Sequence, residues 1–141
     1  MTEKAAKTTG RKPFPGQGVV GTARPPAVSL KKGETVSGSI YNAEPYQVTD
    51  FETREPLEWP DGSPQMGLAI MFNNEETGAK TTLYVQGQER RRNYGAALAA
   101  AGIDPEEGVA AGDYISITYT ANKKTKKGGI AKVYEIVIKP V

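Results

Sequence analysis

Apolar and polar residues alternate along five short segments of the chain, and this period of two is typical of β-strands with one buried face. The predicted strands span residues 34–42, 65–73, 80–86, 113–121 and 132–139. In the first of them Val36 and Ile40 share one face, and Gly38 between them indicates a sharp bend or a bulge. The pattern therefore predicts a β-rich domain.

A helical period replaces the alternation only at residues 88–101. Tyr94, Ala97, Leu98 and Ala101 fall on one stripe of a helix, and Gly102 is a favourable residue just beyond a helix end. The element order is then β-β-β-α-β-β. This is the order of an OB-fold, a five-stranded β-barrel with its helix between the third and fourth strands. We therefore predict an all-β barrel with one helix.

Two segments lie outside these elements. Residues 1–32 carry seven Lys or Arg against one Glu, mixed with Pro, Gly and Thr. This composition predicts a flexible basic arm, in which Val28 and Leu30 are among the few apolar residues that could pack locally. The folded domain is then expected to span residues 33–141. The long connection 43–64 is acidic and carries Tyr46, Phe51 and Trp59. These aromatic residues argue against simple disorder, and we interpret Trp59 as a residue that pins this loop to the barrel.

The residue types present exclude several kinds of chemistry. The chain has no His and no Cys, so it cannot form a Ser-His-Asp triad, a cysteine nucleophile or a His/Cys zinc site. The acidic residues of 43–64 lack the spacing of a nuclease metal site, and no phosphate-binding glycine motif is present. We expect a non-enzymatic protein without a cofactor or metal. The sequence holds no run of 18 apolar residues and no secretory signal, which predicts a cytoplasmic protein without a membrane span.

Basic residues cluster at two places in the C-terminal half. Arg90, Arg91 and Arg92 lie in the first turn of the predicted helix, where cations oppose the helix dipole, so local helix stability does not explain them. Arginine is the preferred residue for phosphate contacts. The loop 122–129 between the last two strands adds four lysines, which are Lys123, Lys124, Lys126 and Lys127. Both groups are candidates for phosphate binding, and the alternative is that both are simply solvated.

Aromatic residues on the strands supply candidate stacking surfaces. Tyr41, Tyr84 and Tyr114 alternate with the predicted core residues, so they are expected on the opposite face. Nucleobases stack on aromatic side chains at such positions. The alternative is that these are ordinary strand residues, as we expect for Tyr119 and Tyr134 in the core.

The segment 33–66 also carries a recognisable run of residues. The positions that form this run are, in order, Gly33, Val36, Gly38, Ile40, Gln47, Thr49, Asp50, Thr53, Pro56, Trp59, Asp61, Gly62 and Pro64. Three further stretches follow it, which are LYVQG (83–87), AALAAAG (96–102) and GDYISITYT (112–120). The run resembles small OB-fold single-stranded DNA-binding proteins of actinobacterial bacteriophages and mobile elements. The resemblance implies a role in phage DNA replication, recombination or repair and no catalytic residues. The chain departs from bacterial single-stranded DNA-binding proteins because it ends in Lys139-Pro140-Val141 rather than in an acidic tail.

The leading hypothesis from the sequence is sequence-tolerant binding of single-stranded DNA, with RNA left open. Bases would stack on the three strand tyrosines, and the arginine and lysine groups would contact phosphates. The alternative is a phage protein-interaction module that binds a host or replisome protein through 43–64. A homo-oligomer is a further expectation, because an exposed edge of the first or last strand could pair with a second copy.

Overall fold

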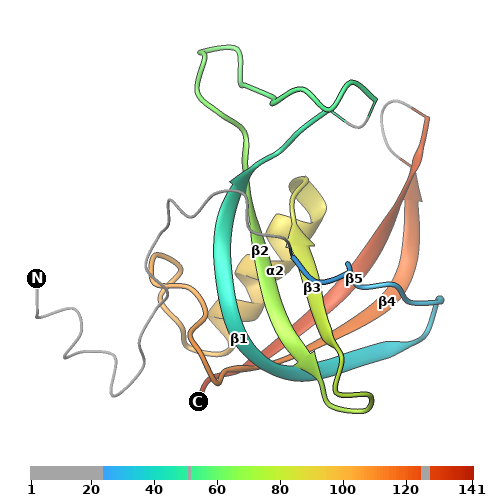
Figure 1. Cartoon of the computed structure of the whole chain (residues 1–141), viewed down its shortest axis with the longest axis vertical. Coiled ribbons are helices and arrows are strands. Elements are labelled where there is room, and N and C mark those ends of the chain that lie inside the picture. Colours follow the sequence, from blue (N-terminus) through green and yellow to red (C-terminus); the bar gives the residue numbers. More distant parts are fainter. Residues whose placement is uncertain (1–23, 51, 125–127) are drawn as a thin grey trace, which may run out of the picture.

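The computed structural model describes residues 24–50, 52–124 and 128–141. The elements follow in the order β1 (Thr35–Gln47), β2 (Met66–Asn74), β3 (Lys80–Val85), α2 (Gln88–Ala100), β4 (Tyr114–Lys124) and β5 (Ile130–Lys139) (Figure 1). All strand pairs are antiparallel, in the sheet order β3-β2-β1-β4-β5. This confirms the predicted β-rich class and element order. The arrangement is compatible with an OB-like fold, although no ladder joins β3 to β5 in the described part of the chain.

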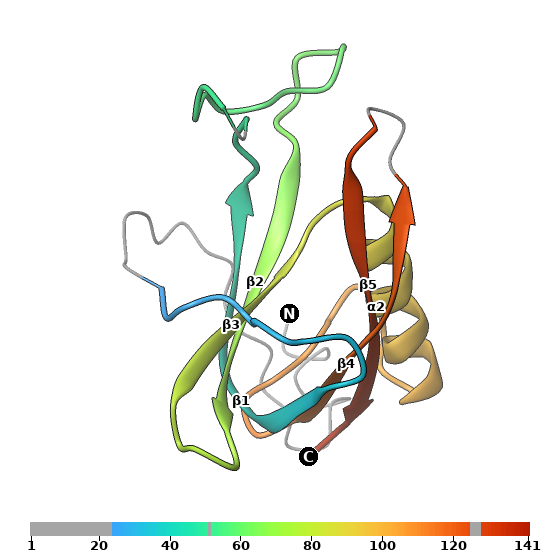
Figure 2. The same ribbon diagram turned by 90° about the vertical axis from the view of Figure 1, so that its right-hand side faces the viewer.

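The core lies inside the curved sheet, where β1, β2 and β3 face β4 and β5 and the helix α2 packs alongside (Figure 2). Its largest fully buried apolar side chains are Phe72, Ile40, Ile70, Leu83, Ile115 and Ile117. Tyr119 and Tyr134 are buried as predicted, with their rings edge to face at 5.8 Å between centroids. These rings fill the end of the core beneath the start of α2.

A bulge lets β1 take part in both halves of the sheet. The register shifts between Ile40 and Asn42, and β1 pairs with β4 before this point and with β2 on both sides of it. Gly38 is needed nearby, because a Cβ atom there would lie 1.6 Å from the carbonyl oxygen of Asn73. The strand runs on to Gln47, so residues 43–47 belong to it and not to the predicted connection.

The last two strands also extend further than the alternation indicated. Lys123 and Lys124 lie in β4 and not in the loop where the sequence placed them. Lys126 and Lys127 lie outside the described residues. The expected hairpin loop therefore begins later than predicted, and two of its four lysines stand on a strand.

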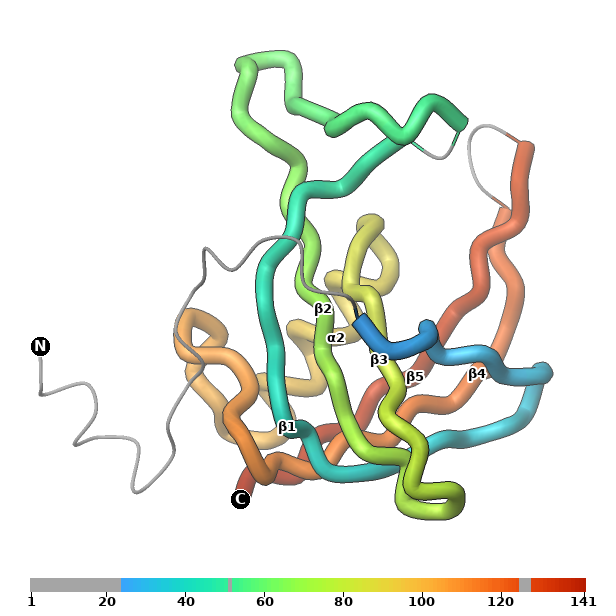
Figure 3. The backbone as a smooth tube through the Cα atoms, viewed as in Figure 1, coloured from blue at the N-terminus to red at the C-terminus, as the bar shows by residue number. Residues whose placement is uncertain are grey.

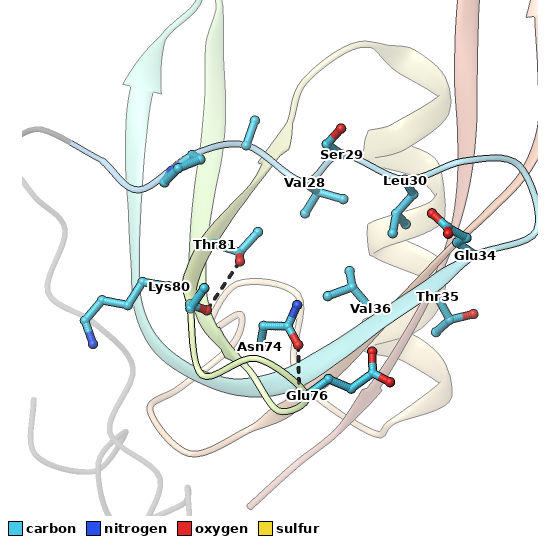
Figure 4. A pocket seen from close by; sticks show the side chains of 13 residues that line it. Val28, Ser29, Leu30, Glu34, Thr35, Val36, Asn74, Glu76, Lys80 and Thr81 are labelled. Carbon is cyan, nitrogen blue, oxygen red and sulfur yellow. Dashed lines mark hydrogen bonds between the residues drawn. The ribbon is translucent and has the colours of Figure 1, made fainter.

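Residues 24–34, called the strap below, cross the gap between β3 and the β4–β5 hairpin (Figures 2 and 3). The Thr82 amide donates to the Pro26 carbonyl and the Val28 amide donates to the Thr82 carbonyl, each at 2.9 Å. Val28 and Leu30 point inward toward Val36 and pack on the core (Figure 4). The packed domain thus includes residues that the sequence assigned to the arm, while 1–23 lie outside the described residues.

One arginine side chain spans the same gap at the end nearer α2. Arg90 Nη1 donates to the Tyr84 carbonyl on β3 at 3.1 Å, and Nη2 donates to the Lys132 carbonyl on β5 at 3.4 Å. Asn93, one turn further along α2, donates to the Tyr134 carbonyl at 2.9 Å. The helix therefore takes the place of direct β3–β5 pairing. The sheet order makes β1 a central strand and β5 an outer one, so of the two edges expected to be available for a second copy only that of β5 lies at the border of the sheet.

Candidate nucleic-acid interface

The first turn of α2 and the end of β4 meet at one carboxylate. Glu89 Oε1 accepts from Lys123 Nζ at 2.9 Å and lies 3.4 Å from Arg92 Nη1. The hydrogen bond and charge of Lys123, followed by the charge of Arg92, hold the pKa of Glu89 below its usual value. Arg91 and Lys124 adjoin these residues along the chain and are exposed. We call Arg91, Arg92, Lys123 and Lys124 the cationic end.

Arg90 does not belong to the cationic end, although the sequence grouped it with its two neighbours. Its guanidinium carbon lies 4.2 Å from the Tyr134 ring centroid, and burial lowers the pKa of the side chain. Two of its nitrogens already donate to the strand carbonyls of the gap. The structure therefore gives Arg90 a role in holding α2 against the sheet, and little of the guanidinium is left for a phosphate.

A groove of about 590 Å³ opens beside the cationic end, between the loop 48–65, the start of β2 and the start of α2. Its lining includes Trp59, Met66 and Arg91, together with the glutamines Gln65, Gln86 and Gln88. Trp59 is 45% exposed and Met66 is 41% exposed. Trp59 therefore lies beside the starts of β2 and α2, and a large part of its side chain is exposed in the groove.

The loop that carries Trp59 is held by its own hydrogen bonds. The Trp59 amide donates to the Ser63 carbonyl at 2.8 Å, and the Gly62 amide donates back to the Trp59 carbonyl at 2.9 Å. Asp61 Oδ1 accepts from both the amide and the hydroxyl of Ser63, which lowers the pKa of Asp61. The backbone amide of Gln65 then donates to the Leu57 carbonyl at 3.0 Å. Trp59 thus stands on an ordered turn, as the aromatic content of this connection indicated.

The three predicted stacking tyrosines lie outside the core but are spread over the sheet. Tyr41 sits in the β1 bulge with Lys80 Nζ 4.9 Å from its ring centroid, and burial raises its pKa. Tyr114 pairs with Ser39 across β1 and β4, and its hydroxyl donates to Glu75 at 2.8 Å. Both rings are half-buried and already engaged. They do not converge with the cationic end into one site.

Tyr84 lies near the groove through Tyr46, which the sequence named only as one of the aromatic residues of the connection 43–64. The Tyr46 and Tyr84 rings meet edge to face at 5.6 Å between centroids, with an angle of 87°. The Tyr46 hydroxyl donates to Oε1 of Gln86, which lines the groove. Burial, followed by the neighbouring Tyr84, raises the pKa of Tyr46 to about 12. The sequence could not place Tyr46 beside Tyr84 on the sheet, because the predicted strand ended at residue 42.

Other kinds of site find little support in the described part of the chain. No three carboxylates gather there closely enough to hold a metal ion. No helix among the described residues has the length and apolar character needed to cross a membrane. Comparisons with protein-family models, curated proteins and solved structures give no match to this chain. The resemblance to phage single-stranded DNA-binding proteins therefore stays a prediction.

Proposed function

We propose that the chain binds single-stranded nucleic acid at the groove and the cationic end, without enzymatic activity. The observation that carries the proposal is the position of an exposed tryptophan in the same groove as Arg91, whose chain neighbour Arg92 shares the Glu89 carboxylate with Lys123. A base can stack on the Trp59 ring while the adjoining phosphates contact Arg91 and then Arg92 and Lys123. A mixed surface of this kind binds strands with little sequence preference, because every base has a flat face.

The charge balance of the site favours a polyanion. The cationic end brings Lys123 and Arg92 to a single carboxylate, Glu89, and Arg91 and Lys124 add two exposed cations beside them in the chain. A phosphate backbone that contacts these four cations releases bound counterions. The affinity should then fall with salt with a log–log slope of about −3, taking roughly −0.7 for each contact with a single strand. Following the resemblance, we place this binding in phage DNA replication, recombination or repair.

The test is fluorescence anisotropy with a labelled oligo-dT at several salt concentrations. Trp59→Ala should weaken binding about 5- to 100-fold, the usual effect of losing one base-stacking ring, and Trp59→Phe should restore most of it. Arg91→Gln should weaken binding and make the salt slope shallower by about 0.7. Lys31→Gln removes one exposed positive charge from the strap and is the matched control. An equal length of oligo-U decides between DNA and RNA.

Two results would refute the proposal. One is undetectable binding of either oligomer at low salt. The other is binding that Trp59→Ala and Arg91→Gln weaken no more than Lys31→Gln does, because the strand would then lie elsewhere on the protein.

A further inference from the structure

The outer face of β1, β2 and β3 is buried although it points away from the core. Strand register places Glu44, Ala69 and Tyr84 in one row across this face, with Met71 and Thr82 in the next row. Glu44 is only 8% exposed and Thr82 is fully buried. Neither Ala69 nor Met71 belongs to the core cluster, yet both are buried as well. Another part of the chain must therefore cover this face.

Residues 24–26 at the start of the strap supply contacts that cover it. Arg24 Nε donates to Glu44 Oε2 at 2.8 Å, and the Arg24 guanidinium carbon lies 5.3 Å from the Tyr46 ring centroid. The Thr82 hydroxyl donates to the Pro25 carbonyl at 2.9 Å. We call residues 24–26 the latch. The arginine is therefore within cation–π range of the Tyr46 ring, an aromatic face of the kind on which a nucleobase can stack.

The latch and the rest of the strap are held by different forces. Val28 and Leu30 pack on the core and point inward, whereas Ser29 between them points away (Figure 4). The latch makes one ion pair and one cation–π contact, and it accepts hydrogen bonds from Thr82. The latch can therefore lift without exposing the core. Lifting would uncover the Tyr46 ring, which meets Tyr84 edge to face, and it would leave the Glu44 carboxylate without its cation.

We infer that the latch is displaceable and that single-stranded nucleic acid bound at the groove opens it to reach the Tyr46–Tyr84 pair. This inference rests on the proposed function. Gln86 connects the two places, because it lines the groove and accepts a hydrogen bond from the Tyr46 hydroxyl. A phosphate of the bound strand competes with Glu44 for Arg24, so the freed arginine gains a new anionic partner. Without nucleic acid, the ion pair keeps the face closed.

Amide hydrogen exchange measured by NMR reports the position of the latch directly. The Thr82 amide donates to the Pro26 carbonyl, so its protection depends on a closed latch. The Ala110 amide, which donates to Asp113 Oδ2 at 2.8 Å in a buried turn, is the internal control. On saturation with oligo-dT we expect exchange at Thr82 to rise about threefold or more, because the ligand favours the open state. Exchange at Ala110 should not change.

A pair of charge variants tests the same inference through affinity. Glu44→Gln removes the latch's partner and should tighten oligo-dT binding by about 3- to 10-fold. Glu135→Gln removes one exposed carboxylate on β5 and should change affinity less than twofold. If the oligomer binds but exchange at the Thr82 amide stays constant or slows, the inference that the latch opens is overturned and the proposed function stands. If no oligomer binds, the inference about the latch and the proposed function are overturned together.

Discussion

Replacing Arg90 with alanine tests whether one side chain holds the two edges of the open sheet together. The guanidinium donates to Tyr84 on β3 at 3.1 Å and to Lys132 on β5 at 3.4 Å, and it lies 4.2 Å from the Tyr134 ring centroid. Alanine removes all three contacts and keeps the high helix propensity of the position. Any loss of stability therefore reports the contacts and not the helix.

The size of the loss follows from the geometry. A hydrogen bond from a charged donor to a carbonyl contributes about 1.5–3 kcal/mol, whereas the bond at 3.4 Å is long and contributes little. The cation–π contact adds about 0.5–2 kcal/mol. Water can reach part of the gap and rehydrate the carbonyls, so we expect the free energy of unfolding to fall by about 2–3 kcal/mol. For a domain of this size, that lowers Tm by roughly 6–15 °C.

Thermal and urea unfolding followed by circular dichroism measure this loss. Arg92→Ala is the matched control, because its exposed pair with Glu89 is screened by solvent and should contribute little to stability. Arg90→Lys keeps the charge but loses the two-pronged donor, so it should recover only part of the stability. If Arg90→Ala destabilises the protein no more than Arg92→Ala does, the proposed bridging role of Arg90 is refuted.

Two further predictions concern the sheet. Gly38→Ala should lower the free energy of unfolding by more than about 3 kcal/mol in urea titration, because the new Cβ would lie 1.6 Å from the Asn73 carbonyl oxygen. Gly95→Ala, which places a Cβ in open space on α2, should raise the free energy of unfolding by about 0.5–1 kcal/mol. Equal effects of the two substitutions would contradict the close approach of the strands at Gly38. Folding raises the pKa of Tyr46 from about 10 to about 12, so its contribution to stability is complete below pH 10 and is lost as the pH rises through 12. Tyr46→Phe should lessen this loss in urea titrations between pH 9 and 12, and an unchanged pH dependence would contradict the assigned burial.

The strand and helix order was predictable because most elements keep one period throughout. The helix was expected at 88–101 and is found at Gln88–Ala100. The end of β1 was not predictable, because the bulge at Tyr41 breaks the period of two and places Ile40 and Ala43 on the same buried face, three residues apart. The alternation of apolar and polar residues is lost at such a point, so the rest of the strand resembles a loop in the sequence.

The candidate site was predictable only in part, for a related reason. The lysines of β4 and the arginines of α2 stood out as runs of charge, and the structure brings Arg92 and Lys123 to one carboxylate. The different environment of Arg90 depends on carbonyls of β3 and β5, which no local pattern reveals. The contact of Arg24 with Glu44 joins residues 20 apart in the chain, and that separation also leaves no signal in a local pattern.

Part of each outer strand of the open sheet is shielded from other chains. On an edge strand every second residue directs its amide and carbonyl outward, where another chain can add a strand. On β3 these residues include Thr82, which bonds the strap, and Tyr84, whose carbonyl accepts from Arg90. On β5 the carbonyls of Lys132 and Tyr134 accept from α2 side chains. The hydrogen bonds to these outer strands can thus protect an incomplete barrel from aggregation. Loss of these hydrogen bonds would favour fibrillar self-association well before the core unfolds.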